Sequence, residues 1–217
     1  MINDVYNYFV RPHLPSKIGV YNGVAVRNRV KLFDIDDEFS EYEEALVASL
    51  RNNVQTGNKV CIVGGGLGVT SVVAANQVGT SGHVRVYEAS EQQVNIVEDT
   101  IKLNQVENRV EVKHAIVGSY FEESIERYGE TGHSTQIPPS ELPECDLLEL
   151  DCEGAELEIL DQMEIQPRKL IIETHGFLNA ETDNVIDIIE NRGYNIESNV
   201  PYLAEKGIDV VTATLEK

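Results

Sequence analysis

The sequence contains little cysteine and no long apolar run, and these two absences exclude several classes of protein. It has three cysteines in 217 residues, an odd number without metal-ligand spacing, so we expect reduced thiols rather than a disulfide framework or a zinc site. No apolar run approaches the ~18–20 residues that span a bilayer. The N-terminal residues, with an early acid and no apolar core, do not read as a signal peptide. We therefore expect a cytoplasmic protein without a membrane partner.

Lysine and arginine are also scarce. There are 17 of them against 37 aspartates and glutamates, which gives a formal net charge of −20. A field of that sign repels phosphate backbones and anionic membranes, so the composition argues against a nucleic-acid partner. The acids are spread along the chain rather than gathered in a tail. This favours an acid-rich surface adapted to high salt, as in a halophile, with an acidic mesophilic protein as the alternative.

The chain carries the pattern of one globular domain preceded by a short N-terminal segment. Its hydrophobic fraction of 41% suffices for a single core. Residues 18–33 predict a small hairpin, because Asn22-Gly23 favours a tight turn with positive φ. Ser40 and Glu43 match a capping box and predict that a helix begins there. We expect a hairpin or lid segment over 1–39 and the main domain over 40–217.

Strands and helices alternate through the main domain. Apolar runs bounded by turn residues predict strands at about 59–63, 83–88, 109–117, 145–151 and 169–174. Capping and periodicity predict helices at about 68–78, from Ser90 onward, and at 121–128, 154–163 and 181–192. The stretch 129–144 reads as a loop, and "YNIES" and "DVVTATLE" predict an antiparallel hairpin. The expected fold is α/β and Rossmann-like, a doubly wound, mainly parallel seven-stranded sheet closed by that hairpin.

Four glycines follow the strand over 59–63 in the segment "KVCIVGGGLGVTS": Gly64, Gly65, Gly66 and Gly68. A glycine turn that leads into a helix brings backbone N–H groups close to a ligand. The spacing G-x-G-x-G differs from the dinucleotide pattern G-x-G-x-x-G, which requires Gly or Ala where Val69 stands. Thr70 is placed at the helix start to hydrogen-bond a carboxylate of the ligand.

Glu88 ends the second strand about 20 residues past Gly68, and it strengthens the case for a nucleoside ligand. A carboxylate at that position accepts hydrogen bonds from both hydroxyls of a ribose. This spacing does not separate a nicotinamide cofactor from S-adenosylmethionine, and a solvated acid at a helix start is the plainer alternative.

The segment "LLELDCEGAELEIL" is the most discriminating of the chain. Asp151 closes a buried strand, and Glu153 and Glu156 flank Gly154 at the start of a helix. The helix dipole accounts for Glu156. It accounts less well for Asp151, because a charge that closes an apolar strand needs partners.

Together with "KLIIETHG", the segment "DCEGAELEIL" resembles the FkbM-like family of class I S-adenosylmethionine-dependent methyltransferases. The hallmarks are Asp-x-Glu-Gly-Ala-Glu after the fourth strand and an Ile-Glu-x-His-like segment after the fifth. The similarity runs through about 40–215. The resemblance implies S-adenosylmethionine as cofactor and O-methylation of a hydroxyl on a small molecule or glycan.

The resemblance also implies roles for individual positions. Gly64, Gly66 and Gly68 would face the methionine part of the cofactor, and Glu88 would hold its ribose. The backbone around Ala115 and Ile116 would border the adenine, and Asp151 would sit beside the methyl donor. The sequence departs from the family at Ile62, where an acid that helps hold the cofactor's amino group commonly stands.

Methyl transfer to a hydroxyl also needs a proton acceptor. His175 is the expected catalytic base, because neutral imidazole is available near pH 7 and the residue follows the fifth strand. Asp151 or Glu153 could serve instead, and His175 could simply pack at the rim. A divalent metal on Asp151, Glu153 and Glu173 is compatible with hard-cation chemistry, but no spacing demands one, and we expect none. A nicotinamide-dependent oxidoreductase and a non-catalytic relative of the fold remain alternatives, and the acceptor and oligomeric state are not readable.

Overall fold

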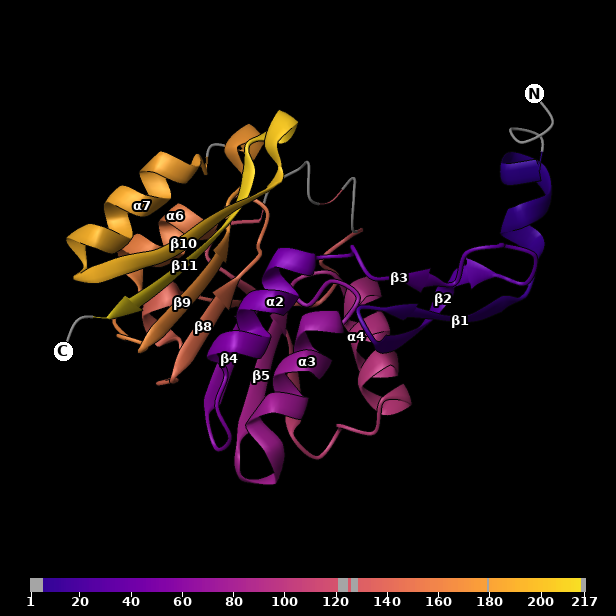
Figure 1. Cartoon of the computed structure of the whole chain (residues 1–217), viewed down its shortest axis with the longest axis horizontal. Coiled ribbons are helices and arrows are strands. Elements are labelled where there is room, and N and C mark those ends of the chain that lie inside the picture. Colours follow the sequence, from indigo (N-terminus) through magenta and orange to yellow (C-terminus); the bar gives the residue numbers. More distant parts are fainter. Residues whose placement is uncertain (1–5, 121–124, 126–128, 179, 216–217) are drawn as a thin grey trace.

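The structure, a computed structural model, describes residues 6–120, 125, 129–178 and 180–215 (Figure 1). Its centre is an eight-stranded sheet in the order β10-β11-β9-β8-β4-β5-β6-β7. The strands are β4 (Lys59–Val63), β5 (His83–Glu88), β6 (Val110–Val117), β7 (Thr135–Ile137), β8 (Leu147–Leu150), β9 (Lys169–Glu173), β10 (Tyr194–Leu203) and β11 (Ile208–Leu215). The doubly wound α/β fold expected from the alternation of strands and helices is confirmed.

The sheet has one strand more than the seven predicted. The additional strand, β7, lies inside the stretch 129–144 that was expected to be a loop, and it pairs in parallel with the end of β6. Three residues at a sheet edge carry no period that a sequence pattern could reveal, and the backbone of β6 recruits them. A short helical turn, η4 (Pro139–Glu141), follows in the same stretch.

The C-terminal strands form the predicted antiparallel hairpin. β11 pairs antiparallel with both β9 and β10, so the last strand of the chain lies inside the sheet and β10 forms the edge. All the other strand pairs of this sheet are parallel. The carboxyl ends of β4, β5, β8 and β9 therefore meet at one edge of the molecule, where open α/β sheets bind ligands.

Helices cover both faces of the sheet and build two apolar layers. They are α2 (Glu44–Asn53), α3 (Val69–Val78), α4 (Glu91–Leu103), α6 (Glu156–Gln162) and α7 (Thr182–Asn191), with short turns η1 (Tyr6–Val10), η2 (Arg11–His13), η3 (Gly79–Ser81), η5 (Gly176–Leu178) and η6 (Ala204–Lys206). Alternate residues of β4 enter opposite layers: Ile62 packs with α2, α3 and α4, and Val63 packs with α6 and α7. Ser90 caps α4 by accepting the N–H of Gln93, as expected. The helix expected over 121–128 lies almost wholly outside the described residues.

The N-terminal segment forms a second, three-stranded sheet that projects from the side of the main body (Figure 1). Its strands are β1 (Ser16–Tyr21), β2 (Val24–Lys31) and β3 (Glu38–Phe39). Asn22 and Gly23 make the predicted turn with φ of 49° and 84°. The buried face of β2, with Val26 and Val30, packs into the same apolar layer as α3 and α4.

The capping box expected at Ser40 and Glu43 is not formed. Helix α2 begins at Glu44, and Glu43 precedes it in the left-handed conformation with no capping hydrogen bond from its side chain. The distortion turns Glu43 away from the helix end. Among the described residues, none of the helices is long and apolar enough to cross a membrane.

Candidate functional site

The glycine loop after β4 packs against the end of β8 so closely that only glycine fits. Gly64 has a φ of 101°, and a Cβ on it would lie 1.8 Å from the carbonyl oxygen of Asp151. Backbone hydrogen bonds join the ends of β4, β8 and β5, since the N–H of Asp151 donates to Val63 and the N–H of Gly64 donates to Tyr87. The loop and the acidic segment thus form one rigid floor.

Above this floor lies a cavity of about 360 Å³. Seven of the residues predicted as site residues line it: Gly64, Gly66, Glu88, Ala115, Ile116, Asp151 and Glu153. They come from four different strand ends, which the sheet order brings together. Three others predicted to touch the cofactor, Gly65, Gly68 and Thr70, are not among the residues that line the cavity.

The structure gives those three residues packing roles. A Cβ on Gly65 would lie 2.8 Å from the side chain of Val97, and one on Gly68 would lie 3.2 Å from Thr100. These glycines therefore let α4 approach the loop. Thr70 is buried within α3, 3% exposed. The expected hydrogen bond from Thr70 to a ligand carboxylate finds no support in this geometry.

Glu88 is anchored by the backbone around it. One carboxylate oxygen accepts the N–H groups of Gly65 at 2.8 Å and Gly66 at 3.3 Å, and the other accepts the N–H of Ser90 at 2.8 Å. Burial raises the pKa of Glu88, and these hydrogen bonds oppose the rise. Glu88 also lines the cavity, so a ligand bound there can reach its carboxylate.

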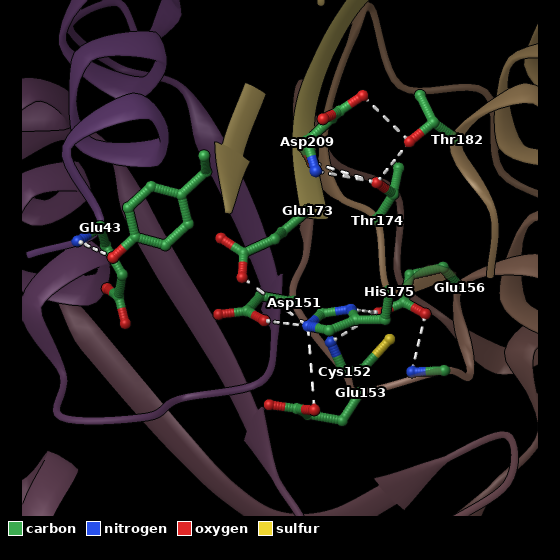
Figure 2. Close-up of polar contacts among 12 residues, drawn as sticks. Glu43, Asp151, Cys152, Glu153, Glu156, Glu173, Thr174, His175, Thr182 and Asp209 are labelled. Atoms are coloured by element: carbon green, nitrogen blue, oxygen red, sulfur yellow. Dashed lines mark hydrogen bonds and ion pairs between the residues drawn. The ribbon is translucent and has the colours of Figure 1, made fainter. Parts of the chain in front are cut away.

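The acidic segment after β8 is organised by Glu156, which is fully buried (Figure 2). Its carboxylate accepts the N–H groups of Cys152 at 3.1 Å and Gly154 at 2.8 Å and so closes the loop on itself. Gly154 and Glu153 both have positive φ, 103° and 53°. A left-handed glutamate beside a cavity is a strained position of the kind that collects at functional sites.

His175 follows β9 and lies behind the cavity wall, 1% exposed. Its Nδ1 donates to Glu156 at 2.8 Å, and its Nε2 faces the carboxylates of Asp151 at 3.6 Å, Glu173 at 3.7 Å and Glu153 at 3.9 Å (Figure 2). Burial alone lowers the pKa of His175, but the hydrogen bond to Glu156 and the surrounding charges raise it to about 10. The neutral base expected near pH 7 is not what this environment favours.

The carboxylates in front of His175 hold their protons tightly as well. Burial and the neighbouring acids raise the pKa of Asp151 to about 7, against the opposing effect of His175. Burial and the charge of Asp151 raise the pKa of Glu173 to about 10. Full ionisation of these carboxylates would place more negative charge here than the single imidazole balances, which opposes the loss of their protons.

Glu43 is the principal residue that sequence reasoning missed. It lines the cavity opposite Asp151, and its Oε1 lies 3.7 Å from the place that a Cβ on Gly66 would occupy. Burial, and then the charge of Asp151, raise the pKa of Glu43 to about 8. The capping-box pattern concealed this role, and only its left-handed φ of 49° marks it. Tyr21 and Arg29 from the N-terminal segment and Tyr42, just before α2, also line the cavity, whereas no residue of 129–144 does.

Ile62, where the family commonly carries an acid, does not reach the cavity. Its side chain is fully buried in the layer of α2 and α3. Its partner on β8 is Glu149, which is also fully buried, so that burial raises its pKa well above the ordinary value. Neither Ile62 nor Glu149 lines the cavity, whereas Glu43 does.

Comparisons with known proteins identify the family and the fold. Residues 63–196, more than half of the chain, match the family model described as Methyltransferase FkbM domain. A comparison with curated proteins gave no match.

Several solved structures share the fold. A SAM-dependent O-methyltransferase from Thermotoga maritima aligns with a TM-score of 0.55 and 16% identity, covering 81% of this chain and 66% of that one. A ribosomal protein L11 methylase from Lactobacillus delbrueckii subsp. bulgaricus aligns at 0.57 and 10%, covering 88% and 92%. Trm5 from Methanocaldococcus jannaschii, in complex with adenosine, aligns at 0.59 and 11%, covering 94% and 57%. At these identities the likeness establishes the fold.

Proposed function

The chain belongs to the FkbM methyltransferase family, and from that premise we propose that it methylates a hydroxyl oxygen of a small molecule or glycan. That it is a methyltransferase, with S-adenosylmethionine as its donor, follows from the family. The nature of the acceptor is the proposal. The observation that carries it is one cavity that joins Glu88 and the glycine loop to the carboxylates of Asp151 and Glu153. The nicotinamide alternative is set aside by the family match.

Three groups of cavity-lining residues are compatible with S-adenosylmethionine: the glycine loop, Glu88, and the backbone of Ala115 and Ile116. Gly64 and Gly66 line the cavity and have no side chains that would fill it. A Cβ on Gly64 would also collide with the backbone of Asp151. Glu88, at the end of β5, would accept hydrogen bonds from a ribose diol, and the backbone of Ala115 and Ile116, which also line the cavity, would border the adenine. These residues would bind and orient the donor.

We assign the cofactor's amino group to Glu43, in place of the acid missing at Ile62. Glu43 stands over Gly66, where the resemblance places the methionine part of the cofactor. A half-buried carboxylate with a raised pKa gains from a cationic partner, because the ammonium offsets both its desolvation and the charge of Asp151. The strained backbone of Glu43 is then explained as the means of aiming this side chain.

When bound, S-adenosylmethionine supplies a methyl group on a cationic sulfur, and in-line attack by a hydroxyl oxygen breaks the C–S bond as the O–C bond forms. The chain's own part is to align the acceptor and to take its proton. Asp151 and Glu153 line the cavity, so we propose this pair as the proton acceptor. His175, behind the wall and fixed by Glu156, positions their carboxylates.

The acceptor would enter from the side of the N-terminal segment. Tyr21 and Arg29 of β1 and β2 and Tyr42 before α2 supply that wall. This supports the interpretation of residues 1–39 as a lid segment over the main domain. We also propose a cytoplasmic location, on the composition of the sequence.

Calorimetry with S-adenosylhomocysteine, followed by methyl transfer from labelled donor to hydroxylated metabolites and glycans, tests the proposal. We expect saturable binding by the wild type and label in an ether linkage that resists base hydrolysis. Asp151→Asn should retain the calorimetric binding and lose transfer at least tenfold. Label recovered as a base-labile ester or an N-methyl group would refute O-methylation of a hydroxyl, and absence of binding would refute the site.

A further inference from the structure

The carboxylates around His175 outnumber the basic groups near them. Within the described part of the chain, His175 is the only basic ion-pair partner of Asp151, Glu156 and Glu173. Both Glu156 and Glu173 are buried, 0% and 7% exposed. Ionised together, these carboxylates would outnumber the one imidazole in a region of low dielectric, and a bound cation would favour that ionised form.

The spacing of these groups is wrong for hydrogen bonds and right for a shared ion. The oxygens of Asp151, Glu173 and Glu153 lie 3.6, 3.7 and 3.9 Å from Nε2 of His175. The donor–acceptor distance of an N–H···O hydrogen bond rarely exceeds about 3.2 Å. Two ligands bound at about 2.1 Å to one cation stand about 3.0 Å apart at right angles and about 4.2 Å apart when opposite. The observed distances fall inside that interval.

An independent observation comes from the far oxygen of Glu173. The residue is more than nine-tenths buried, and its carboxylate points toward Asp151 and His175 (Figure 2). Its Oε2 has no hydrogen-bond partner among the described residues. A buried carboxylate that turns its Oε1 to the cluster and leaves its Oε2 without a partner is a group that a bound cation would satisfy.

The other side of the imidazole is arranged as in a metal-bound histidine. Nδ1 donates to Glu156 at 2.8 Å and Nε2 faces the three carboxylates, so release of the Nε2 proton would direct a lone pair at a cation held there. Histidines that ligate metals almost always hold their second ring nitrogen in this way, with a carboxylate or carbonyl that fixes the tautomer. Glu156 is itself held by the N–H groups of Cys152 and Gly154, so the arrangement is rigid.

We propose that Asp151, Glu173 and His175 form a binding site for a divalent cation of the Mn²⁺ type, with Glu153 within reach as a fourth ligand. The ligand atoms of the first three lie within 4.8 Å of one another. A set of one imidazole and two or three carboxylates suits Mn²⁺, because it accepts nitrogen and oxygen ligands alike. The absence of any metal-ligand spacing in the sequence is explained, since the ligands come from two separate strand ends.

A cation held there would border the cavity, since Asp151 belongs both to the cluster and to the cavity wall. A part in the reaction rests on the proposed function. The ion would bind the acceptor hydroxyl and make it more acidic, and Glu153, where the other three residues alone hold the ion, would take the proton. Binding of the ion itself does not depend on that role.

The test is a titration of chelator-treated protein with Mn²⁺, following the electron paramagnetic resonance signal of the free ion in molar KCl. The salt suppresses diffuse binding to a surface with a net charge of −20. We expect one saturable site per chain. Glu173→Gln and Asp151→Asn should each weaken it at least tenfold, and the exposed control Glu190→Gln on α7 should leave it unchanged.

Equal affinity in Glu173→Gln and wild type, or no saturable site at all, would overturn the proposal. Circular dichroism establishes that each variant is folded, and Asp151→Asn provides the second test if Glu173→Gln unfolds. Calorimetry with S-adenosylhomocysteine on the same samples separates the two ideas. If S-adenosylhomocysteine binds and Mn²⁺ does not, only the metal site is refuted. If Mn²⁺ binds and S-adenosylhomocysteine does not, only the proposed function is refuted.

Discussion

Replacing Glu88 with glutamine should weaken the fold and the ligand together, for reasons that can be worked out separately. The carboxylate accepts the N–H groups of Gly65 and Gly66 on one oxygen and of Ser90 on the other. Glutamine has one acceptor oxygen, so its amide nitrogen must face at least one backbone donor. An unsatisfied buried donor costs about 1–3 kcal/mol. A loss of about 2 kcal/mol lowers the melting temperature of a chain of this size by about 4–8 °C.

The ligand is affected through the ribose. Hydrogen bonds to a charged acceptor contribute about 1.5–3 kcal/mol, so loss of the charge should weaken S-adenosylhomocysteine about 10- to 100-fold. Calorimetry below the melting transition of the variant measures this directly. 5′-Methylthioadenosine, which keeps the ribose and lacks the amino-acid part, should weaken by the same factor. Glu91→Gln, an exposed acid at the start of α4, is the matched control.

If Glu88→Gln melts several degrees lower but binds S-adenosylhomocysteine as tightly as wild type, Glu88 only holds the glycine loop and the assignment to the ribose is wrong. If neither quantity changes, the backbone contacts of Glu88 are wrong as well.

Four further outcomes are expected. Glu43→Gln should weaken S-adenosylhomocysteine about tenfold and leave 5′-methylthioadenosine unchanged, because only the former has the amino group; equal effects on both would remove that assignment. Gly64→Ala should abolish binding and lower the melting temperature far more than Gly193→Ala, whose φ is +87° but whose added Cβ meets nothing within 4 Å. The pKa of Glu88 is raised above its ordinary 4.5, and its ionised form is the acceptor. Affinity should therefore fall as the pH drops through that raised value, while protonation at this group favours the fold; a flat affinity down to pH 4.5 would contradict it. The melting temperature should rise from low to molar KCl as salt screens the net charge of −20, and a constant value would exclude a salt-adapted surface.

Much of the fold followed from local patterns. The apolar runs placed β4, β5 and β9 to within a residue, and the turn at Asn22-Gly23 formed as its residues require. These features depend on neighbours within a few positions, so a sequence carries them directly. The local capping pattern of Ser40 and Glu43 did not predict the structure correctly. Glu43 does not cap the helix and instead lines the cavity, where contacts with distant segments hold it.

The sequence by itself determined that a glycine loop, an acid after β5 and an acidic segment after β8 stand at strand ends, which predicted a nucleoside-binding α/β domain. Only the tertiary structure decided which side chains meet there. It turned His175 away from the cavity toward Glu156, brought Glu173 to Asp151, and placed Glu43 where Ile62 could not reach. The physical reason is that the order of strands sets these meetings. β4, β8 and β9 are neighbours in the sheet through parallel pairing, although long stretches of chain separate them, and no local period records that order.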